Sequence, residues 1–283
     1  MTAGGYPIRP SILRPARDGA IVALLALAVA HALELTQVGV DAHAYWAVDP
    51  ADPYAHTRPG EFGAFFYAPV AAQLLAPFQA LPWPLFAAAW SLVLAAALVW
   101  QAGLWTAFAL LLLPVFAEVA AGNIHLLLGV AVIVGFRWPA AWAFVLLTKV
   151  TPGIGLLWFA VRREWRSLAI ALCATIALAG ASFAFAPDLW SRWIEVLTAA
   201  AGAEEWPFTV QVPLPIRLAA AAALVIWGAR TDRRWTVPAG ATLALPVLWV
   251  NGLAMLVAAM PLIATRVGET PASRWLAARA RAA

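Results

Sequence analysis

Two ionisable side chains in apolar surroundings are the first candidates for chemistry in this sequence. Lys149 lies about ten residues from either end of the apolar range 139–161, roughly 15 Å deep at 1.5 Å per residue. A cation at that depth costs about 2.5–3.5 kcal/mol on insertion, so it needs a reason to be there. Lys149 either faces a polar cavity that holds an anionic group or forms an internal ion pair with Glu118, and both interpretations stay open.

Asp41 is the candidate for proton transfer. It follows directly after the apolar range 19–38, so we expect it at the membrane surface, held there by the helix before it. A carboxylate in that position can act as a general base toward a hydroxyl group. The same loop also carries Asp49, Asp52 and Glu61, and as a plain solvated carboxylate Asp41 would not differ from them.

Two short polar segments could complete a site around these residues. Asn123 and His125 follow a glycine at the boundary between two apolar ranges, although a helix-capping turn alone would explain Gly-Asn. The segment 148–152 surrounds Lys149 with two threonines and a helix-breaking proline. This pattern favours a locally opened helix backbone beside the lysine.

Metal and redox chemistry are not expected. Cys173 is the only cysteine and lies inside an apolar run, so it has no partner for a disulfide or a thiolate cluster. Asp49 and Asp52, with Pro50 between them, do not form the cluster of hard oxygen ligands that Mg or Mn needs. We therefore expect neither a metal nor a cofactor.

The composition indicates the surroundings in which these residues must lie. Of 283 residues, 64% are hydrophobic and 11% are charged, whereas soluble domains have about 45–50% and about 25%. No Asp, Glu, Lys or Arg occurs between Glu61 and Glu118, or from Trp235 to Thr265. A helix needs about 20 apolar residues to cross a bilayer. The pattern predicts an all-α, polytopic transmembrane protein and excludes a soluble enzyme, a secreted disulfide scaffold and a nucleic-acid-binding module.

We expect about ten spans in a single transmembrane domain, residues 19–265, between a cytoplasmic segment (1–18) and a basic cytoplasmic tail (266–283). The apolar stretch from Gly19 is as long as a full span, so we interpret it as the first span and not as a cleavable signal peptide. The last two expected spans could form one long tilted helix. The spans are 19–38, 66–81, 84–101, 103–119, 122–136, 139–161, 167–186, 214–229, 236–250 and 252–265.

The distribution of charges orients these spans. Acidic residues gather in two long loops, 39–65 and 187–213, whereas most arginines lie in four clusters. If the chain crosses the membrane about ten times, all four clusters lie on the face opposite the two acidic loops. Because Lys and Arg are retained on the cytoplasmic side, we expect both termini in the cytoplasm and both acidic loops outside. The basic clusters cover residues 9–17, 162–166, 230–234 and 266–281.

Three segments, in order, resemble glycosyltransferase family 87, and the likeness extends over about residues 19–170. The first segment contains Asp41, Tyr45 and Asp52-Pro53-Tyr54, followed by Phe66-Tyr67-Ala68-Pro69. The second, Gly122-Asn123-Ile124-His125, is similar to the family's Gly-Gln-x-Asn segment, with Asn123 and His125 in place of Gln and Asn. The third, Thr148-Lys149-Val150-Thr151-Pro152, resembles the family's Lys-x-x-Pro segment.

The resemblance implies a GT-C type membrane enzyme of bacteria. Such enzymes take a sugar, usually mannose, from a polyprenyl-phosphate donor and pass it to an acceptor hydroxyl on the outer face of the plasma membrane. The acceptor would be a glycolipid or a glycan, and the family's acidic residue in the first outer loop implies Asp41 as the general base. We expect Lys149, Arg58 and His125 to bind the donor phosphate, and Tyr45, Tyr54, Tyr67 and Asn123 to bind substrate.

Two other classes of protein stay open. A small membrane transporter or lipid flippase could use Lys149 and Glu118 to line a translocation path. A structural membrane subunit would be favoured only if substitutions at neither Asp41 nor Lys149 had an effect. An Asp41→Ala substitution separates the first alternative from the glycosyltransferase, because a path centred on Lys149 would survive it.

Overall fold

The computed structural model describes residues 10–33, 39–55, 57, 64–201, 209–263 and 271–280. Within this part of the chain the secondary structure is helical, which confirms the expected all-α class. The β-type pairing among the same residues is one isolated bridge, between Thr209 and Trp249.

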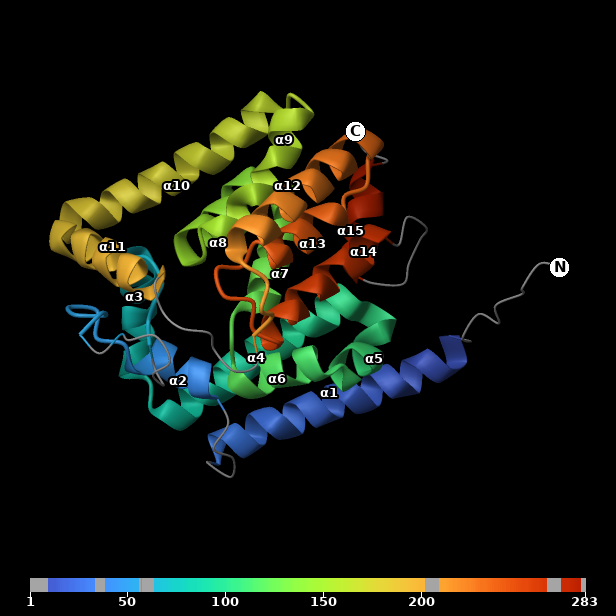
Figure 1. Cartoon of the computed structure of the whole chain (residues 1–283). Helices are drawn as coiled ribbons and strands as arrows, with labels where there is room; N and C mark the ends of the chain where they lie inside the picture. Colours follow the sequence, from blue (N-terminus) through green and yellow to red (C-terminus); the bar gives the residue numbers. More distant parts are fainter. Residues whose placement is uncertain are drawn as a thin grey trace.

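In the first half of the chain, a long helix lies along one side of the molecule. Figure 1 shows this helix, α1, across the lower edge, and it packs mainly on α4 and on the short elements that follow α4. Several of the helices begin with proline in their first turn, where its missing N–H and fixed φ do no harm. The elements are α1 (Pro10–Ala32), α2 (Val40–Ala47), α3 (Pro69–Leu75), η1 (Ala76–Ala80), α4 (Trp83–Ala102), η2 (Gly103–Trp105), α5 (Thr106–Leu111), α6 (Leu113–Ala121) and α7 (His125–Gly135).

In the second half, α10 and α11 form an outer edge, while α12, α13 and η5 pack together and reach α7 (Figure 1). The large buried side chains Trp142, Trp158 and Phe159 belong to the core that these elements share. The elements are η3 (Pro139–Ala141), α8 (Trp142–Thr148), η4 (Thr151–Leu156), α9 (Leu157–Val161), α10 (Trp165–Phe185), α11 (Pro187–Ala201), α12 (Leu214–Thr231), α13 (Thr236–Leu243), η5 (Asn251–Ala259), α14 (Met260–Ile263) and α15 (Pro271–Ala280).

A buried arginine holds the end of α13 against α12. The guanidinium of Arg217 donates hydrogen bonds to the carbonyl oxygens of Leu243 and Leu245, at 2.8 and 2.6 Å, and to that of Pro246 at 3.0 Å. Leu243 is the last residue of α13 and the other two lie just beyond it, so their carbonyl oxygens have no partner within the helix. Arg217 therefore supplies the donors that water would otherwise provide.

Three helical stretches of the described chain are long and apolar enough to cross a membrane. They are 83–111, which runs from α4 through α5, together with α10 and α12. The helices α6 and α7 form a fourth only if they are counted together, and they are bent by 105° at the break between them. Three shorter apolar stretches, 139–148, 151–161 and 251–263, complete the apolar helices. The expected number of about ten spans therefore remains a prediction.

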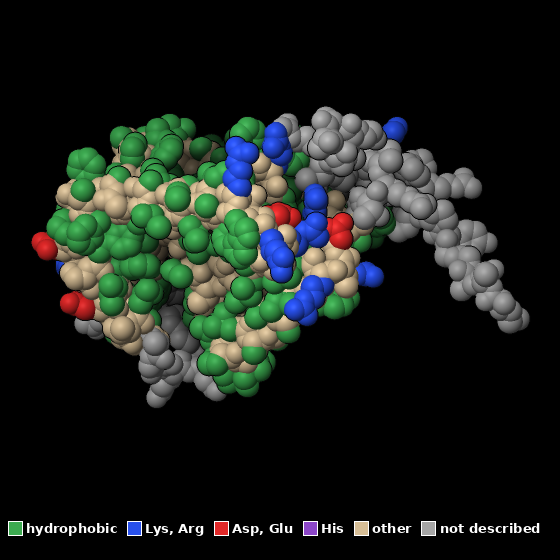
Figure 2. Space-filling view, turned by 90° about the horizontal axis from the view of Figure 1, so that it is seen from above, with side chains coloured by type: hydrophobic (Ala, Val, Ile, Leu, Met, Phe, Trp, Pro, Cys, Tyr) green, Lys and Arg blue, Asp and Glu red, His purple; other side chains and the backbone are tan. Residues whose placement is uncertain are grey.

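The outer surface fits a membrane protein. Large apolar side chains of α10 and α12 are exposed, among them Ile176 at 68%, Phe183 at 54% and Trp227 at 46%. Figure 2 shows that hydrophobic side chains cover most of the face seen from above, and that Lys and Arg gather in one region of it. Apolar area of this extent is stable in contact with lipid and not with water.

Several expected spans are broken or displaced in the structure. The range 103–119 is divided at Leu112, before Pro114, and the range 139–161 is interrupted at Lys149, whose φ and ψ of −140° and 107° are those of an extended chain. This interruption confirms the opened backbone expected there. The expected first span, 19–38, is preceded by helix from Pro10 onward, and the expected outer loop 187–213 contains the helix α11.

Candidate functional site

Asp41 lies in the first turn of α2, a helix that begins directly after Gly39. The glycine adopts a left-handed conformation with φ of 97°, and its N–H donates to the carbonyl oxygen of Ala120 at 2.8 Å. This contact joins the start of α2 to the end of α6. A carboxylate in the first turn of a helix is also favoured by the unpaired N–H groups there. Asp41 is partly buried at this position.

A chain of hydrogen bonds leads from Asp41 into the molecule. The amide nitrogen Nδ2 of Asn123 donates to Oδ2 of Asp41 at 2.7 Å, and Oδ1 of Asn123 accepts from the hydroxyl of Tyr45 at 3.2 Å. The hydroxyls of Tyr45 and Tyr67 lie 2.9 Å apart. Among the described residues, no hydrogen bond is donated to Oδ1 of Asp41. That oxygen is therefore available to an incoming hydroxyl group.

The bend between α6 and α7 brings Asn123 to Asp41. Gly122 forms the turn with φ of 75°, and a Cβ atom at this position would lie 2.6 Å from the Cβ of Ala42. Both the left-handed backbone and the close approach require glycine. The indole of Trp90 donates to the carbonyl oxygen of Gly122 at 2.7 Å and so fixes the turn from the side of α4.

Glu118 holds the other side of the same bend. Its carboxylate accepts hydrogen bonds from the backbone N–H groups of His125 and Leu126, at 2.5 and 3.3 Å, and from Nδ1 of His125 at 2.9 Å. The N–H groups belong to the first turn of α7 and have no partner within that helix. Both side chains are fully buried, and among the described residues Nε2 of His125 has no hydrogen-bond partner.

Lys149 lies where the chain opens between α8 and η4. Its ammonium group is 5.5 Å from the centre of the Tyr67 ring, in the arrangement of a cation–π contact. Within the described part of the chain, Lys149 forms no ion pair, so the pairing with Glu118, one of the two interpretations left open by the sequence, is not formed. The reason is that the carboxylate of Glu118 is occupied by α7. The ammonium group of Lys149 thus keeps its capacity to bind an anion.

The two expected outer loops meet close to Tyr67. The guanidinium of Arg192 in α11 forms an ion pair with the carboxylate of Asp52, with nitrogen-to-oxygen distances of 2.7 and 2.8 Å. The indole of Trp193 donates to the carbonyl oxygen of Phe66 at 3.0 Å, and Tyr54 donates to that of Tyr67 at 2.7 Å. These bonds fix the segment that carries Tyr67.

The protonation states follow from burial and neighbours. Burial raises the pKa of Asp41, while the hydrogen bond from Asn123 and the charge of Lys149 oppose this rise. Burial also raises the pKa of Tyr45 far above the ordinary value for a phenol. Tyr45 is therefore a neutral hydroxyl that can donate a hydrogen bond.

The structure brings together five of the residues that the sequence singled out. We refer to Asp41, Tyr45, Tyr67, Asn123 and Lys149 as the Asp41 cluster. Tyr54 supports the cluster through the backbone of Tyr67, whereas the ring of His125 is buried behind it against Glu118. Arg58 lies outside the described residues.

Sequence reasoning missed two supports of the cluster. The contribution of Trp90 left no signal, because its indole is one of 16 and resembles those at the membrane boundary. Arg192 is an isolated cation in an acidic loop, and its charge was a usable signal for a partner such as Asp52.

The comparison with protein families identifies the chain. The model of glycosyltransferase family 87 matches residues 65–282, which is most of the sequence. The chain belongs to this family, and it is therefore a membrane glycosyltransferase. Tyr67, Asn123 and Lys149 lie within the matched range, whereas Asp41 and Tyr45 precede it. No curated protein and no solved structure matches the chain.

Proposed function

We propose that the protein transfers mannose from a polyprenyl-phosphate donor to an acceptor hydroxyl at the outer face of a bacterial plasma membrane, with Asp41 as the general base. The single observation that carries the proposal is the hydrogen bond from Asn123 to one oxygen of Asp41. It fixes the carboxylate while the other oxygen stays available. A base held in one geometry beside a cation is what transfer from a phosphate donor requires.

In this reaction, the acceptor hydroxyl gives its proton to Asp41 and its oxygen attacks the anomeric carbon of the sugar. The bond between that carbon and the phosphate oxygen breaks, and polyprenyl phosphate leaves with the electron pair. Negative charge grows on the leaving phosphate in the transition state, and a cation nearby stabilises it. Lys149 is the described residue of the cluster that can do so, since its ammonium group is not in an ion pair.

Arg58 is a second candidate for the phosphate, and Tyr45, Tyr67 and Asn123 for contacts with the substrates. We infer that His125 acts indirectly, through Glu118 and the α6–α7 bend, because its ring is fully buried. The phosphate is already joined to the donor sugar, and we propose that transfer proceeds without a metal. A chelator should then leave the rate of transfer unchanged.

We propose further that the shorter apolar helices complete a domain of about ten spans with both termini in the cytoplasm. This arrangement places the Asp41 cluster on the outer side, where a lipid-linked donor and a glycolipid or glycan acceptor can both approach. The transporter alternative has less support, since it relies on Lys149 acting with Glu118, whose carboxylate binds His125 instead.

Membranes that contain the native chain should transfer radiolabelled mannose from polyprenyl-phosphate-mannose to extracted lipids. The Asp41→Asn variant should be slower by about 100-fold or more, the usual effect of losing a general base. Asp49→Asn is the matched control, because Asp49 is an exposed carboxylate of the same loop, and it should retain full activity. Equal activity of the native chain and Asp41→Asn would exclude the proposed mechanism.

A further inference from the structure

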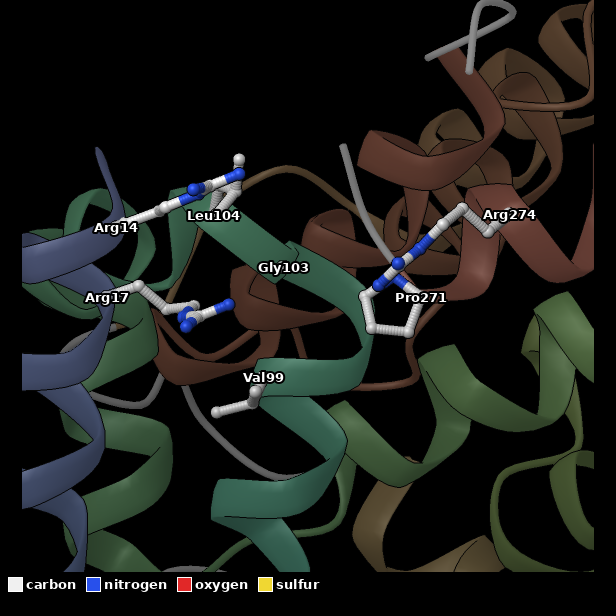
Figure 3. Close-up of a pocket in the computed structure, with 7 residues that line it drawn as sticks. All are labelled: Arg14, Arg17, Val99, Gly103, Leu104, Pro271 and Arg274. Carbon is white, nitrogen blue, oxygen red and sulfur yellow. The ribbon is translucent and has the colours of Figure 1, made fainter. Parts of the chain in front are cut away.

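A pocket lined by three arginines lies at the end of the molecule where α1 begins. Arg14 and Arg17 come from the first turns of α1, and Arg274 comes from α15. Figure 3 shows the two arginines of α1 extending toward the end of α4, with Arg274 and Pro271 on the far side of that end. The floor is apolar and consists of Val99, Gly103 and Leu104.

The pocket is separate from the Asp41 cluster. Arg14 is near the start of α1, whereas Asp41 follows the opposite end of that helix. The helix has 23 residues, which corresponds to roughly 34 Å at 1.5 Å per residue. A ligand in this pocket therefore cannot touch the residues proposed for sugar transfer.

The arginines of the pocket lack the partners that other arginines of this protein have. Arg162 pairs with Glu164 and Asp232, while Arg233 lies over the ring of Trp227. In the part of the chain that the structure describes, Arg14 and Arg274 form no ion pair or hydrogen bond, and Arg17 pairs only with its exposed neighbour Asp18.

Cations that share a pocket repel one another unless an anion lies between them. Guanidinium groups present a planar fork of N–H donors, which fits the oxygens of a phosphate group. The apolar floor suits the glycerol and first methylene groups of a lipid, and basic pockets between membrane helices bind anionic head groups. We propose that this pocket binds the phosphate group of an anionic membrane lipid.

The test uses the full chain, purified in a zwitterionic detergent, with native mass spectrometry to count bound lipids. Phosphatidylglycerol should bind at least about tenfold more tightly than phosphatidylcholine, because the choline cation beside the phosphate of phosphatidylcholine is repelled by the arginines of the pocket. In an Arg14→Gln/Arg274→Gln variant this preference should disappear. An Arg14→Lys/Arg274→Lys variant should keep part of it, because it keeps the charge and loses the fork.

The matched control is an Arg166→Gln/Arg230→Gln variant, which removes two exposed arginines outside the pocket. This variant should keep the preference for phosphatidylglycerol. A preference that survives the pocket substitutions, or that the control loses equally, would overturn the proposal. Unfolding midpoints measured without anionic lipid show whether each variant is folded before its affinity is compared.

A second arm separates a lipid head group from free phosphate. Inorganic phosphate is added in place of the lipid, and its effect on the unfolding midpoint is compared between the native chain and the pocket variant. Stabilisation by phosphate that depends on Arg14 and Arg274 supports the phosphate chemistry of the pocket. If it occurs without any preference for phosphatidylglycerol over phosphatidylcholine, the ligand is a free phosphate and the lipid assignment is wrong.

Discussion

At the scale of single residues, the protonation state of Asp41 determines the pH range in which the enzyme is active. Burial raises the pKa of Asp41, and a general base acts only as the carboxylate. We predict that kcat/KM falls as the pH is lowered, with a midpoint above the ordinary aspartate value of about 3.9. The pH dependence of transfer, measured at low donor concentration, gives this midpoint. A midpoint at or below the ordinary value would contradict the assignment of Asp41 as the base.

Asn123 has a measurable influence on the same midpoint. Its amide donates to Oδ2 of Asp41 at 2.7 Å and so favours the charged form. In an Asn123→Ala variant the effect of burial is less opposed, so the pKa of Asp41 rises and the acid limb of the pH profile moves to higher pH. Asn123→Gln keeps an amide donor and corresponds to the residue of the family segment. It should restore most of the activity and the native midpoint.

At the scale of elements, the bend between α6 and α7 depends on one carboxylate. Glu118 accepts three hydrogen bonds from the first turn of α7, including the imidazole of His125. A Glu118→Ala variant leaves those donors buried without a partner, and we expect it to lose at least about 2 kcal/mol of stability. Thermal unfolding of the purified chain measures this loss, and sugar transfer should fall with it because the turn at Asn123 loosens.

The control for that prediction is Glu164→Ala. Glu164 is partly exposed and pairs with Arg162 at the surface. Exposed ion pairs contribute about 0–1 kcal/mol to the stability of a protein. The unfolding midpoint of the Glu164→Ala variant should therefore remain near that of the native chain. If the two variants unfolded at the same temperature, Glu118 would not support the bend as inferred.

The interruptions of the helices were only partly predictable. The opened backbone at Lys149 was predicted from the proline three residues later. The structure shows this opening. The 105° bend at Gly122 was not predicted as such, because hydrophobicity is the same in a straight span and in two short helices. The bend also requires a residue without a Cβ atom beside Ala42, and no local sequence pattern reveals that neighbour.

At the scale of the whole molecule, the sequence could not predict which residues far apart in the chain come into contact. Asp41 and Asn123 are 82 residues apart, and counting straight spans places them at opposite faces of the membrane. Their hydrogen bond exists because the chain turns back within the apolar region. By contrast, Lys149 was chosen because charges are scarce inside the apolar ranges, and Asp41 because it directly follows the range 19–38. The sequence displays both features directly.

The proposed topology makes a prediction for the chain as a whole. In a Cys173→Ser background, a Ser191→Cys variant places a thiol in α11, and a Thr231→Cys variant places one at the end of α12. Both positions are exposed. A membrane-impermeant maleimide should label Cys at position 191 in intact cells, and at position 231 only after permeabilisation. The reverse pattern would invert the proposed orientation.

Lys149, at the opened backbone, can also be modified selectively by a chemical reagent. Lys149 is the only lysine in the printed sequence, and the other basic side chains are arginines and histidines. Apart from the amino terminus of the chain, an amine-selective acylating reagent has one group to modify. Protection of that single amine by added polyprenyl phosphate would therefore report occupancy directly, by peptide mass alone, even in a variant that no longer transfers sugar.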